Sequence, residues 1–277
     1  MKVGLALGML HPGRWLEITQ EADRLGYESV WLPEHLVMPV QMSGSPNAGE
    51  EHPPVPPEVQ VFDVFAYLSF LAAATDRIRL GTNVFNIGLR HPFVSARAVA
   101  TADVLSGGRI EYGIGASWLA EEWTAAGLDF HTRGRRVDEA LQVSKQLWTE
   151  RTIAHDGEFF QFAEVMFEPK PVQDPHPPVH VGGDSAAAKR RAALHGDGWI
   201  PLTTPLEGIR SGREEIEAMR ETAGRAGRIE VTLTGAVTTP DDLERYADAG
   251  VDRLLVHPWE RTSQALEAVQ RFAEQYL

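Results

Sequence analysis

The feature that most constrains this sequence is a repeated alternation between short runs rich in β-branched residues and longer segments with helical spacing of their apolar residues. In residues 14–25, Trp15, Ile18, Ala22 and Leu25 fall on one helix face, and Gly26 follows where a helix C-cap favours glycine. Residues 239–243 (TPDDL) supply an N-cap, a proline at the first helical position and acidic residues in the first turn. Eight short runs, each followed by such a segment, are predicted as strands: residues 3–7, 29–32, 78–84, 109–114, 179–181, 198–200, 230–234 and 253–256.

Eight strand–helix units in 277 residues have the pattern and the size of an α/β (β/α)8 TIM barrel. The alternative is an open, doubly wound sheet, which binds dinucleotides through a G-x-G-x-x-G turn after its first strand. The turn in this sequence is GMLHPG (residues 8–13), which lacks that motif. We therefore favour the barrel and expect a single domain over residues 1–277.

Two stretches interrupt the alternation. Residues 36–60, after the second strand, are rich in Pro, Gly, Ser, Glu and Asn and are too long for an ordinary connection. In a barrel this loop is either a lid over the catalytic end or a surface insertion. Residues 153–172 contain Asp156-Gly157 before Phe159-Phe160, which predicts a β-hairpin inserted after the fourth helix (residues 133–149).

Composition excludes several classes of protein and site. The chain has no cysteine, which excludes disulfide scaffolds, thiolate nucleophiles and cysteine-ligated metal sites. Its formal net charge of −13 disfavours nucleic acid and anionic membranes as partners. The first residues match a strand and not a signal peptide, and no apolar run is long enough to span a bilayer. We expect a cytoplasmic protein that acts on a small molecule, with no metal site.

The barrel prediction selects candidate residues, because chemistry in this fold sits at the carboxyl ends of the strands. Glu34 and His35 follow the second strand. His35 could act as a general acid or base, since its ordinary pKa lies near neutrality, and Glu34 could orient it or bind a polar group of the substrate. The alternative is that this pair is an exposed loop element with no function.

The turn after the fifth strand is the second candidate. Gly182 and Gly183 precede Ser185 and a predicted helix, so backbone N–H groups could approach a phosphate at the helix N-terminus. The alternative is a plain tight turn in which Asp184 or Ser185 is the N-cap. The charge of Asp184 argues against a phosphate at this place.

The turn after the fourth strand offers an aromatic wall. Trp118, followed by Glu121, Glu122 and Trp123, could cover a flat ring, or the segment could begin a helix that packs on the barrel. Further along, Arg133, Arg135 and Arg136 could bind an anionic tail. We favour a structural role for these arginines, paired with acids such as Glu121, Glu122, Asp138 and Glu139.

Together, these segments resemble the bacterial luciferase-like superfamily of TIM-barrel flavin and deazaflavin enzymes. The resemblance runs through EADRLGYESVW (residues 21–31) with Glu34-His35, TDRIRLGTNV (75–84), His91-Pro92, LSGGR (105–109), GIGASW (113–118), and Gly182-Gly183 through GDGW (196–199). The sequence is most similar to a short branch of F420-dependent oxidoreductases, whose signature here is WLAEE (118–122) followed by GLDFHTRG (127–134).

The resemblance implies roles for particular residues. A non-proline cis peptide bond at Asn83–Val84 would support the deazaflavin ring of F420, and Gly115, Ser117 and Trp118 would line the ring site. Gly182, Gly183 and Ser185 would hold the phosphate. His35 would lie beside the reacting carbon of the ring, with Glu34 in place of a frequent aspartate. Trp118 stands where the sugar-phosphate dehydrogenases of the superfamily carry a catalytic acid, so oxidation of a sugar phosphate with that acid is not expected.

We therefore expect an oxidoreductase that uses coenzyme F420 for hydride transfer to or from a small organic substrate. The alternatives are an FMN-dependent luciferase-like monooxygenase, which uses reduced flavin and oxygen, and a flavin-binding barrel without turnover. F420 carries a polyglutamate tail, so either local arginines offset the charge of −13 or the tail stays in solvent. Relatives often dimerise through barrel helices, which implies a homodimer.

Overall fold

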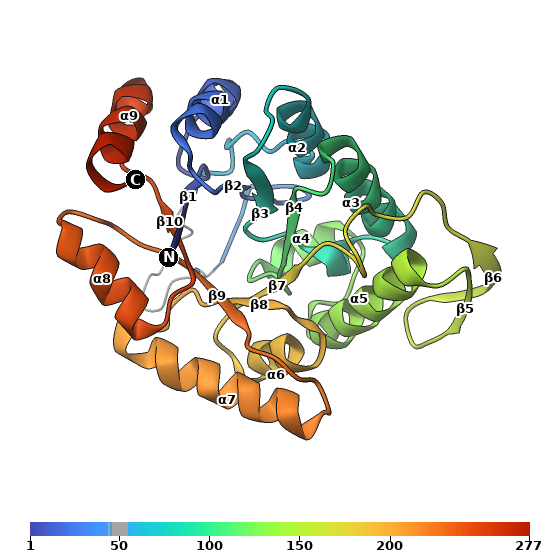
Figure 1. Cartoon of the computed structure of the whole chain (residues 1–277). Coiled ribbons are helices and arrows are strands. Elements are labelled where there is room, and N and C mark those ends of the chain that lie inside the picture. The colour runs from blue at the N-terminus through green and yellow to red at the C-terminus, as the bar shows by residue number, and fades with distance from the viewer. Residues whose placement is uncertain (44, 46–54) are drawn as a thin grey trace.

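The structure is a computed structural model that describes residues 1–43, 45 and 55–277. Eight strands of this part of the chain pair in parallel and close into a barrel in the order β1-β10-β9-β8-β7-β4-β3-β2 (Figure 1). The (β/α)8 prediction is therefore confirmed. The strands are β1 (Lys2–Ala6), β2 (Ser29–Leu32), β3 (Arg79–Thr82), β4 (Ile110–Ile114), β7 (Val179–Gly182), β8 (Gly198–Ile200), β9 (Glu230–Thr234) and β10 (Arg253–Val256).

Helices surround the barrel (Figure 1). The apolar face predicted for the first helix is buried through Trp15, Ile18 and Ala22, and Gly26 ends that helix with a φ of 91°. The last helix packs beside the first and completes the ring. The helices are α1 (Trp15–Leu25), α2 (Val64–Ala73), α3 (Pro92–Ser106), α4 (Ala120–Ala125), α5 (Arg133–Thr149), α6 (Ala186–His195), α7 (Ile209–Thr222), α8 (Pro240–Ala249) and α9 (Ala265–Tyr276). No helix of the described residues is long and apolar enough to cross a membrane.

The inserted hairpin is confirmed. Strands β5 (Thr152–Asp156) and β6 (Gln161–Met166) pair antiparallel after α5 and lie outside the barrel (Figure 1). The predicted third strand was too long, because β3 ends at Thr82 and the chain then turns toward the site. Of the loop predicted at residues 36–60, residues 44 and 46–54 lie outside the described residues.

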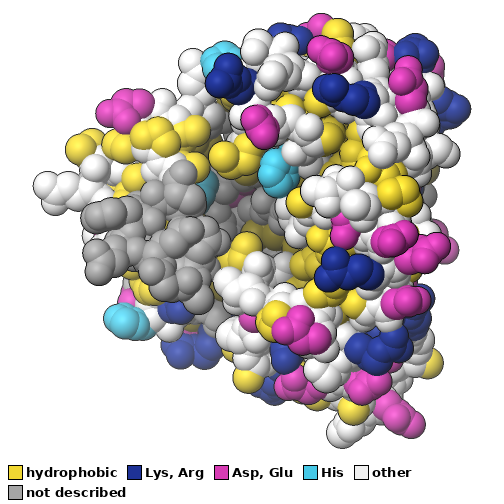
Figure 2. Space-filling view, turned by 90° about the vertical axis from the view of Figure 1, so that its left-hand side faces the viewer, with side chains coloured by type: hydrophobic (Ala, Val, Ile, Leu, Met, Phe, Trp, Pro, Cys, Tyr) yellow, Lys and Arg dark blue, Asp and Glu magenta, His cyan; other side chains and the backbone are white. Residues whose placement is uncertain are grey.

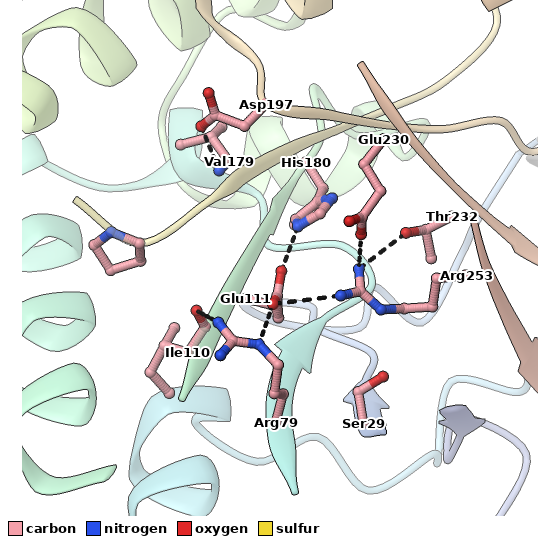
Figure 3. Close-up of polar contacts among 12 residues, drawn as sticks. Ser29, Arg79, Ile110, Glu111, Val179, His180, Asp197, Glu230, Thr232 and Arg253 are labelled. Carbon is pink, nitrogen blue, oxygen red and sulfur yellow. Dashed lines mark hydrogen bonds and ion pairs between the residues drawn. The ribbon is translucent and has the colours of Figure 1, made fainter. Parts of the chain in front are cut away.

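The amino-terminal end of the barrel interior is filled by charged side chains (Figure 3). Arg253, which is fully buried, pairs with Glu28, Glu111 and Glu230, and Glu111 also binds Arg79 and His180. Burial alone would raise the pKa of Glu111, but the hydrogen bond from His180 and the charges of Arg253 and Arg79 hold that pKa well below its ordinary value. These contacts join five of the barrel strands and the residue before β2.

An apolar cluster lies in the interior of the barrel as well. Trp31, Ile200 and Leu255 are buried together, apart from the main core between barrel and helices, and Ala6 and Val84 pack against them. The interior is therefore charged at its amino-terminal end and apolar toward the carboxyl ends of the strands, where the site residues were predicted.

Candidate functional site

A cavity of about 620 Å³ lies at the carboxyl ends of the barrel strands. Its walls come from the segments that follow or end β2, β3, β4, β7, β8 and β9, and from the beginnings of α5 and α6. A hollow opens among hydrophobic side chains in the face shown in Figure 2. The structure brings together around this cavity every residue predicted for the site: Glu34, His35, Asn83, Val84, Gly115, Ser117, Trp118, Gly182, Gly183 and Ser185.

His35 is oriented by a buried carboxylate. Its Nδ1 atom lies 3.1 Å from Oε2 of Glu122, whose side chain is completely buried in α4. The other carboxylate oxygen accepts the backbone N–H of Leu36 at 2.5 Å. A carboxylate acceptor favours the proton on Nδ1, so Nε2 is free to accept or, when His35 is protonated, to donate a proton. Nε2 has no partner among the described residues.

The interpretation that Glu34 orients His35 is wrong. Both oxygens of Glu34 are directed elsewhere: Oε1 pairs with Nη2 of Arg90 at 2.5 Å, and Oε2 accepts the backbone N–H of Asn86 at 2.8 Å. Burial raises the pKa of Glu34, and the charge and hydrogen bond of Arg90 oppose that rise. Glu34 therefore joins the end of β2 to the segment after β3, and Glu122 has the orienting role.

Val84 is held between two glycines. A β-carbon on Gly115 would lie 2.6 Å from Cγ2 of Val84, and one on Gly182 would lie 3.0 Å from its Cγ1. Any larger residue at Gly115 would collide with Val84, which explains the glycine there. The Asn83–Val84 peptide bond is cis, as the resemblance to the luciferase-like superfamily implied. The backbone on this side of the cavity is therefore closely fitted around one valine.

The turn after β4 places Ser117 and Trp118 beside His35. Ser117 has a φ of 64°, in the left-handed region that non-glycine residues rarely adopt. Its hydroxyl accepts the N–H of Leu119 and lies 3.5 Å from Oε2 of Glu122. The ring of Trp118 meets the His35 ring edge to face, with centroids 6.1 Å apart. Trp123 is buried in the core instead, which agrees with the interpretation that this segment begins a helix packed on the barrel.

The turn between β7 and α6 has backbone N–H groups without an acceptor among the described residues. Ser185 is the N-cap, because its hydroxyl accepts the N–H of Ala188 at 3.1 Å. Within the described residues no hydrogen bond occupies the backbone N–H groups of Ser185, Ala186 or Ala187. Since Ser185 and Ala187 line the cavity, these donors and the helix dipole make this end of α6 suitable for an anion.

Asp184 does not oppose an anion in the way that the sequence suggested. Its carboxylate accepts the N–H groups of Leu202 and Thr203 at 3.1 and 2.8 Å and the hydroxyls of Thr203 and Thr204. Burial alone would raise the pKa of Asp184, but the hydrogen bonds from Thr204, Thr203 and Leu202 lower it below its ordinary value. The charge of Asp184 is therefore used to join the turn after β7 to the loop after β8.

Two arginines reach the cavity. The structural interpretation of the arginine run holds for Arg135, although its partner is Glu158. Arg136 donates to the carbonyl of Gly88 and lies over the ring of Phe160. Arg133 lines the cavity, stacks on Phe130, and pairs with no carboxylate of the described residues. The expectation that this run pairs with Glu121, Glu122, Asp138 and Glu139 was wrong for all three arginines.

Arg191 is the second cation in the wall. It is buried in α6, where Asp138 binds its Nε and the carbonyl of Gly134 accepts its Nη2 at 3.1 Å. Its Nη1 has no partner among the described residues. Among the described lining residues, Arg90 balances Glu34 and Asp138 balances Arg191, so Arg133 is the lining arginine whose charge no described carboxylate offsets.

Sequence reasoning missed the role of Glu122 as the partner of His35 and the place of Arg191 in the cavity wall, and it favoured a structural role for Arg133. Their spacing gave no signal, since the contact between His35 and Glu122 joins residues 87 positions apart. The described residues hold no cluster of three or more His, Cys, Asp or Glu side chains that could bind a metal ion. The site thus offers one oriented histidine, a wall closely fitted around Val84, and free backbone donors at the start of α6.

A family model described as luciferase-like monooxygenase matches residues 5–276. An uncharacterized protein of Mycobacterium tuberculosis is 32% identical over 256 residues, which cover 91% of this chain and 90% of that protein. The F420-dependent glucose-6-phosphate dehydrogenase of Kineococcus radiotolerans is 31% identical over 237 residues, 80% of this chain and 64% of that protein. The FMNH2-dependent dimethylsulfone monooxygenase of Pseudomonas putida is 32% identical over 164 residues, 58% of this chain and 45% of that protein.

Among solved structures, an F420-dependent secondary alcohol dehydrogenase in complex with an F420–acetone adduct superposes with a TM-score of 0.80. The alignment covers 99% of this chain and 97% of that chain at 17% sequence identity, which supports the same fold.

Proposed function

Because the chain belongs to the luciferase-like monooxygenase family, we propose that it uses coenzyme F420 for hydride transfer to or from a small organic substrate. The family membership establishes an oxidoreductase; the choice of cofactor is the proposal. The observation that carries it is the composition of the cavity wall, which combines an oriented histidine, the free N-terminus of α6 and two arginines.

The wall fits a flat ring attached to an anionic chain. The space that side chains on Gly115 and Gly182 would occupy is filled by Val84, which leaves a smooth surface for a ring. The free N–H groups of Ser185, Ala186 and Ala187 suit a phosphate. Arg133, which has no carboxylate partner among the described residues, supplies local positive charge for a polyglutamate tail on a protein with a net charge of −13.

When bound, the deazaflavin supplies the carbon that gives or accepts the hydride, chemistry that a chain without thiols cannot supply from its own side chains. Glu122 holds His35 through Nδ1, so that Nε2 can deliver a proton to the substrate or take one from it. The ring of Trp118 lies against His35, whose side chain is 19% exposed, so part of the imidazole is shielded from water.

The second candidate is an FMN-dependent monooxygenase. The Pseudomonas putida relative supports it, and a flavin ring and its phosphate would use the same wall. The dehydrogenase of Kineococcus radiotolerans aligns with more of this chain, and Arg133 adds an unpaired positive charge to the phosphate donors of α6. These two observations favour F420.

The test is to assay both chemistries with one protein preparation. Reduced F420 is mixed anaerobically with a panel of small carbonyl and alkene compounds, and absorbance at the oxidised-coenzyme band is followed. In parallel, reduced FMN, oxygen and sulfur or hydrocarbon substrates are tested for oxygenated product. Turnover only in the second assay would overturn the proposal. If His35→Ala leaves any observed turnover unchanged, the role given to His35 is wrong.

The proposal includes the domain organisation, the oligomeric state, the location and the partners of the protein. We take residues 1–277 as one barrel domain that acts as a homodimer on a small molecule in the cytoplasm, without nucleic acid as a partner.

A further inference from the structure

Val84 occupies a position at which three strands meet. Its two methyl groups fill the places where side chains on Gly115 and Gly182 would stand, at the carboxyl ends of β4 and β7. Val84 itself follows β3 and lines the cavity. The backbone at the two glycines therefore restricts sideways movement of Val84. Support from inside the barrel has to come from other residues.

Trp31 belongs to the cluster against which Val84 packs. This tryptophan is 1% exposed and forms the interior cluster with Ile200 and Leu255. A β-carbon on Gly81 would lie 2.4 Å from Cδ2 of Trp31, so the indole lies directly against the backbone of β3. The indole is the largest side chain of the cluster against which Val84 packs.

Polar contacts hold the indole of Trp31 in one orientation. Its Nε1 donates to Oγ of Ser29 at 2.9 Å, and the ring of His180 meets it edge to face with centroids 5.4 Å apart. The guanidinium of Arg253 lies 5.3 Å from the ring centroid. Ser29, His180 and Arg253 are among the residues drawn in Figure 3. Ion pairs with Glu111 hold His180 in turn, and ion pairs with Glu28 and Glu230 hold Arg253.

We propose that Trp31 is a positioning residue that supports Val84 and thereby sets the surface on which the cofactor ring rests. The charged contacts at the amino-terminal end of the barrel act on the site through this indole. That Trp31 supports Val84 follows from the packing of the interior cluster. That this support affects cofactor binding rests on the proposed function. Trp31 does not line the cavity, so it acts on the cofactor only through Val84.

The test compares Trp31→Phe with Trp148→Phe. Trp148 is a matched control, because it is buried in α5, donates to the carbonyl of Ala96 and lies outside both the cavity and the interior cluster. Hydrogen exchange is measured in the protein without cofactor at two amides: Phe85, which bonds to Gly113, and Gly115, which bonds to Phe85. We expect exchange at both amides to rise at least about tenfold in Trp31→Phe relative to a reference peptide in α9. Trp148→Phe should leave that ratio at the wild-type value.

Equal ratios in the two variants would overturn the proposal. If Trp31→Phe does not fold, Leu255→Val replaces it, because this substitution removes one methylene from the same cluster. The same ratio of exchange, at Phe85 and Gly115 relative to the α9 peptide, is then measured. A second arm measures the dissociation constant of F420, which we expect to rise at least about tenfold in Trp31→Phe and to stay unchanged in Trp148→Phe. Wild-type protein that binds neither F420 nor FMN would overturn the proposed function, and the exchange ratio would still decide the role of Trp31.

Discussion

The Nδ1 atom of His35 lies 3.1 Å from Oε2 of Glu122, a carboxylate with no exposed surface. The pair joins the end of β2 to α4 and fixes which nitrogen of the histidine faces away from the carboxylate. Because Glu122 also accepts the N–H of Leu36, one side chain positions both the histidine and the segment that follows it.

We expect Glu122→Gln to lower the turnover number by roughly 10- to 100-fold with little change in the dissociation constant of the cofactor. The amide can donate to Nδ1 and so favours the opposite tautomer of His35. Single-turnover kinetics and the ¹⁵N shifts of the imidazole check this. Glu121→Gln is the control, since Glu121 lies beside Glu122 in the sequence but bonds to Ser43 and not to His35. A tautomer unchanged in Glu122→Gln would contradict the account.

Arg133→Gln tests the positive wall of the cavity. The side chain has no carboxylate partner among the described residues, so its charge is available to a ligand. We expect the substitution to weaken binding of F420 roughly tenfold, and to reduce the salt dependence of that binding. Arg135→Gln, which removes an exposed arginine paired with Glu158, should leave both quantities unchanged. Equal loss in the two variants would mean that only the general charge of the surface matters.

Asp184→Asn tests the junction between the turn after β7 and the loop after β8. The folded-state pKa of Asp184 lies below its ordinary value of 3.8, so the unfolded chain takes up this proton at higher pH than the folded protein does. The stability contributed by Asp184 is therefore complete above pH 3.8 and is lost as the pH falls through the lower, folded-state pKa.

Urea unfolding of wild type and Asp184→Asn should show a difference in the free energy of unfolding at pH 7 that narrows as the pH approaches 3. The exposed Asp248 provides the matched substitution Asp248→Asn, for which little difference is expected at either pH. A gap for Asp184→Asn that is constant over this range would rule out the ionised carboxylate as the stabilising acceptor.

Arg253→Met tests the charged contacts inside the barrel. Removing this guanidinium leaves Glu28, Glu111 and Glu230 without their shared cation, so we expect the free energy of unfolding to fall by about 3–5 kcal/mol. The control Arg245→Met removes an exposed arginine paired with Asp242 on α8 and should cost less than about 1 kcal/mol. Similar losses in both variants would show that the interior network contributes no more than a surface pair.

The fold could be predicted from the sequence because local patterns specify it. Apolar spacing, the C-cap at Gly26 and the N-cap at Thr239 are properties of consecutive residues, and the barrel follows from their repetition. The charged filling of the barrel could not be predicted. Arg79, Glu111 and Arg253 are far apart in the sequence, and only the closed barrel brings them together.

The candidate site could be predicted in part. The rule that chemistry lies at strand ends, with the resemblance, selected ten residues that the structure places around one cavity. The rule says nothing of which side chain holds another. Adjacent Glu34 therefore looked like the partner of His35, whereas Arg90 binds Glu34 and distant Glu122 binds the histidine.

Titration of the purified protein with F420 and with FMN, followed by fluorescence, tests the central claim most directly. The account predicts saturable binding of F420 with a dissociation constant at least about tenfold below that of FMN. Saturable binding of FMN without any response to F420 would contradict it.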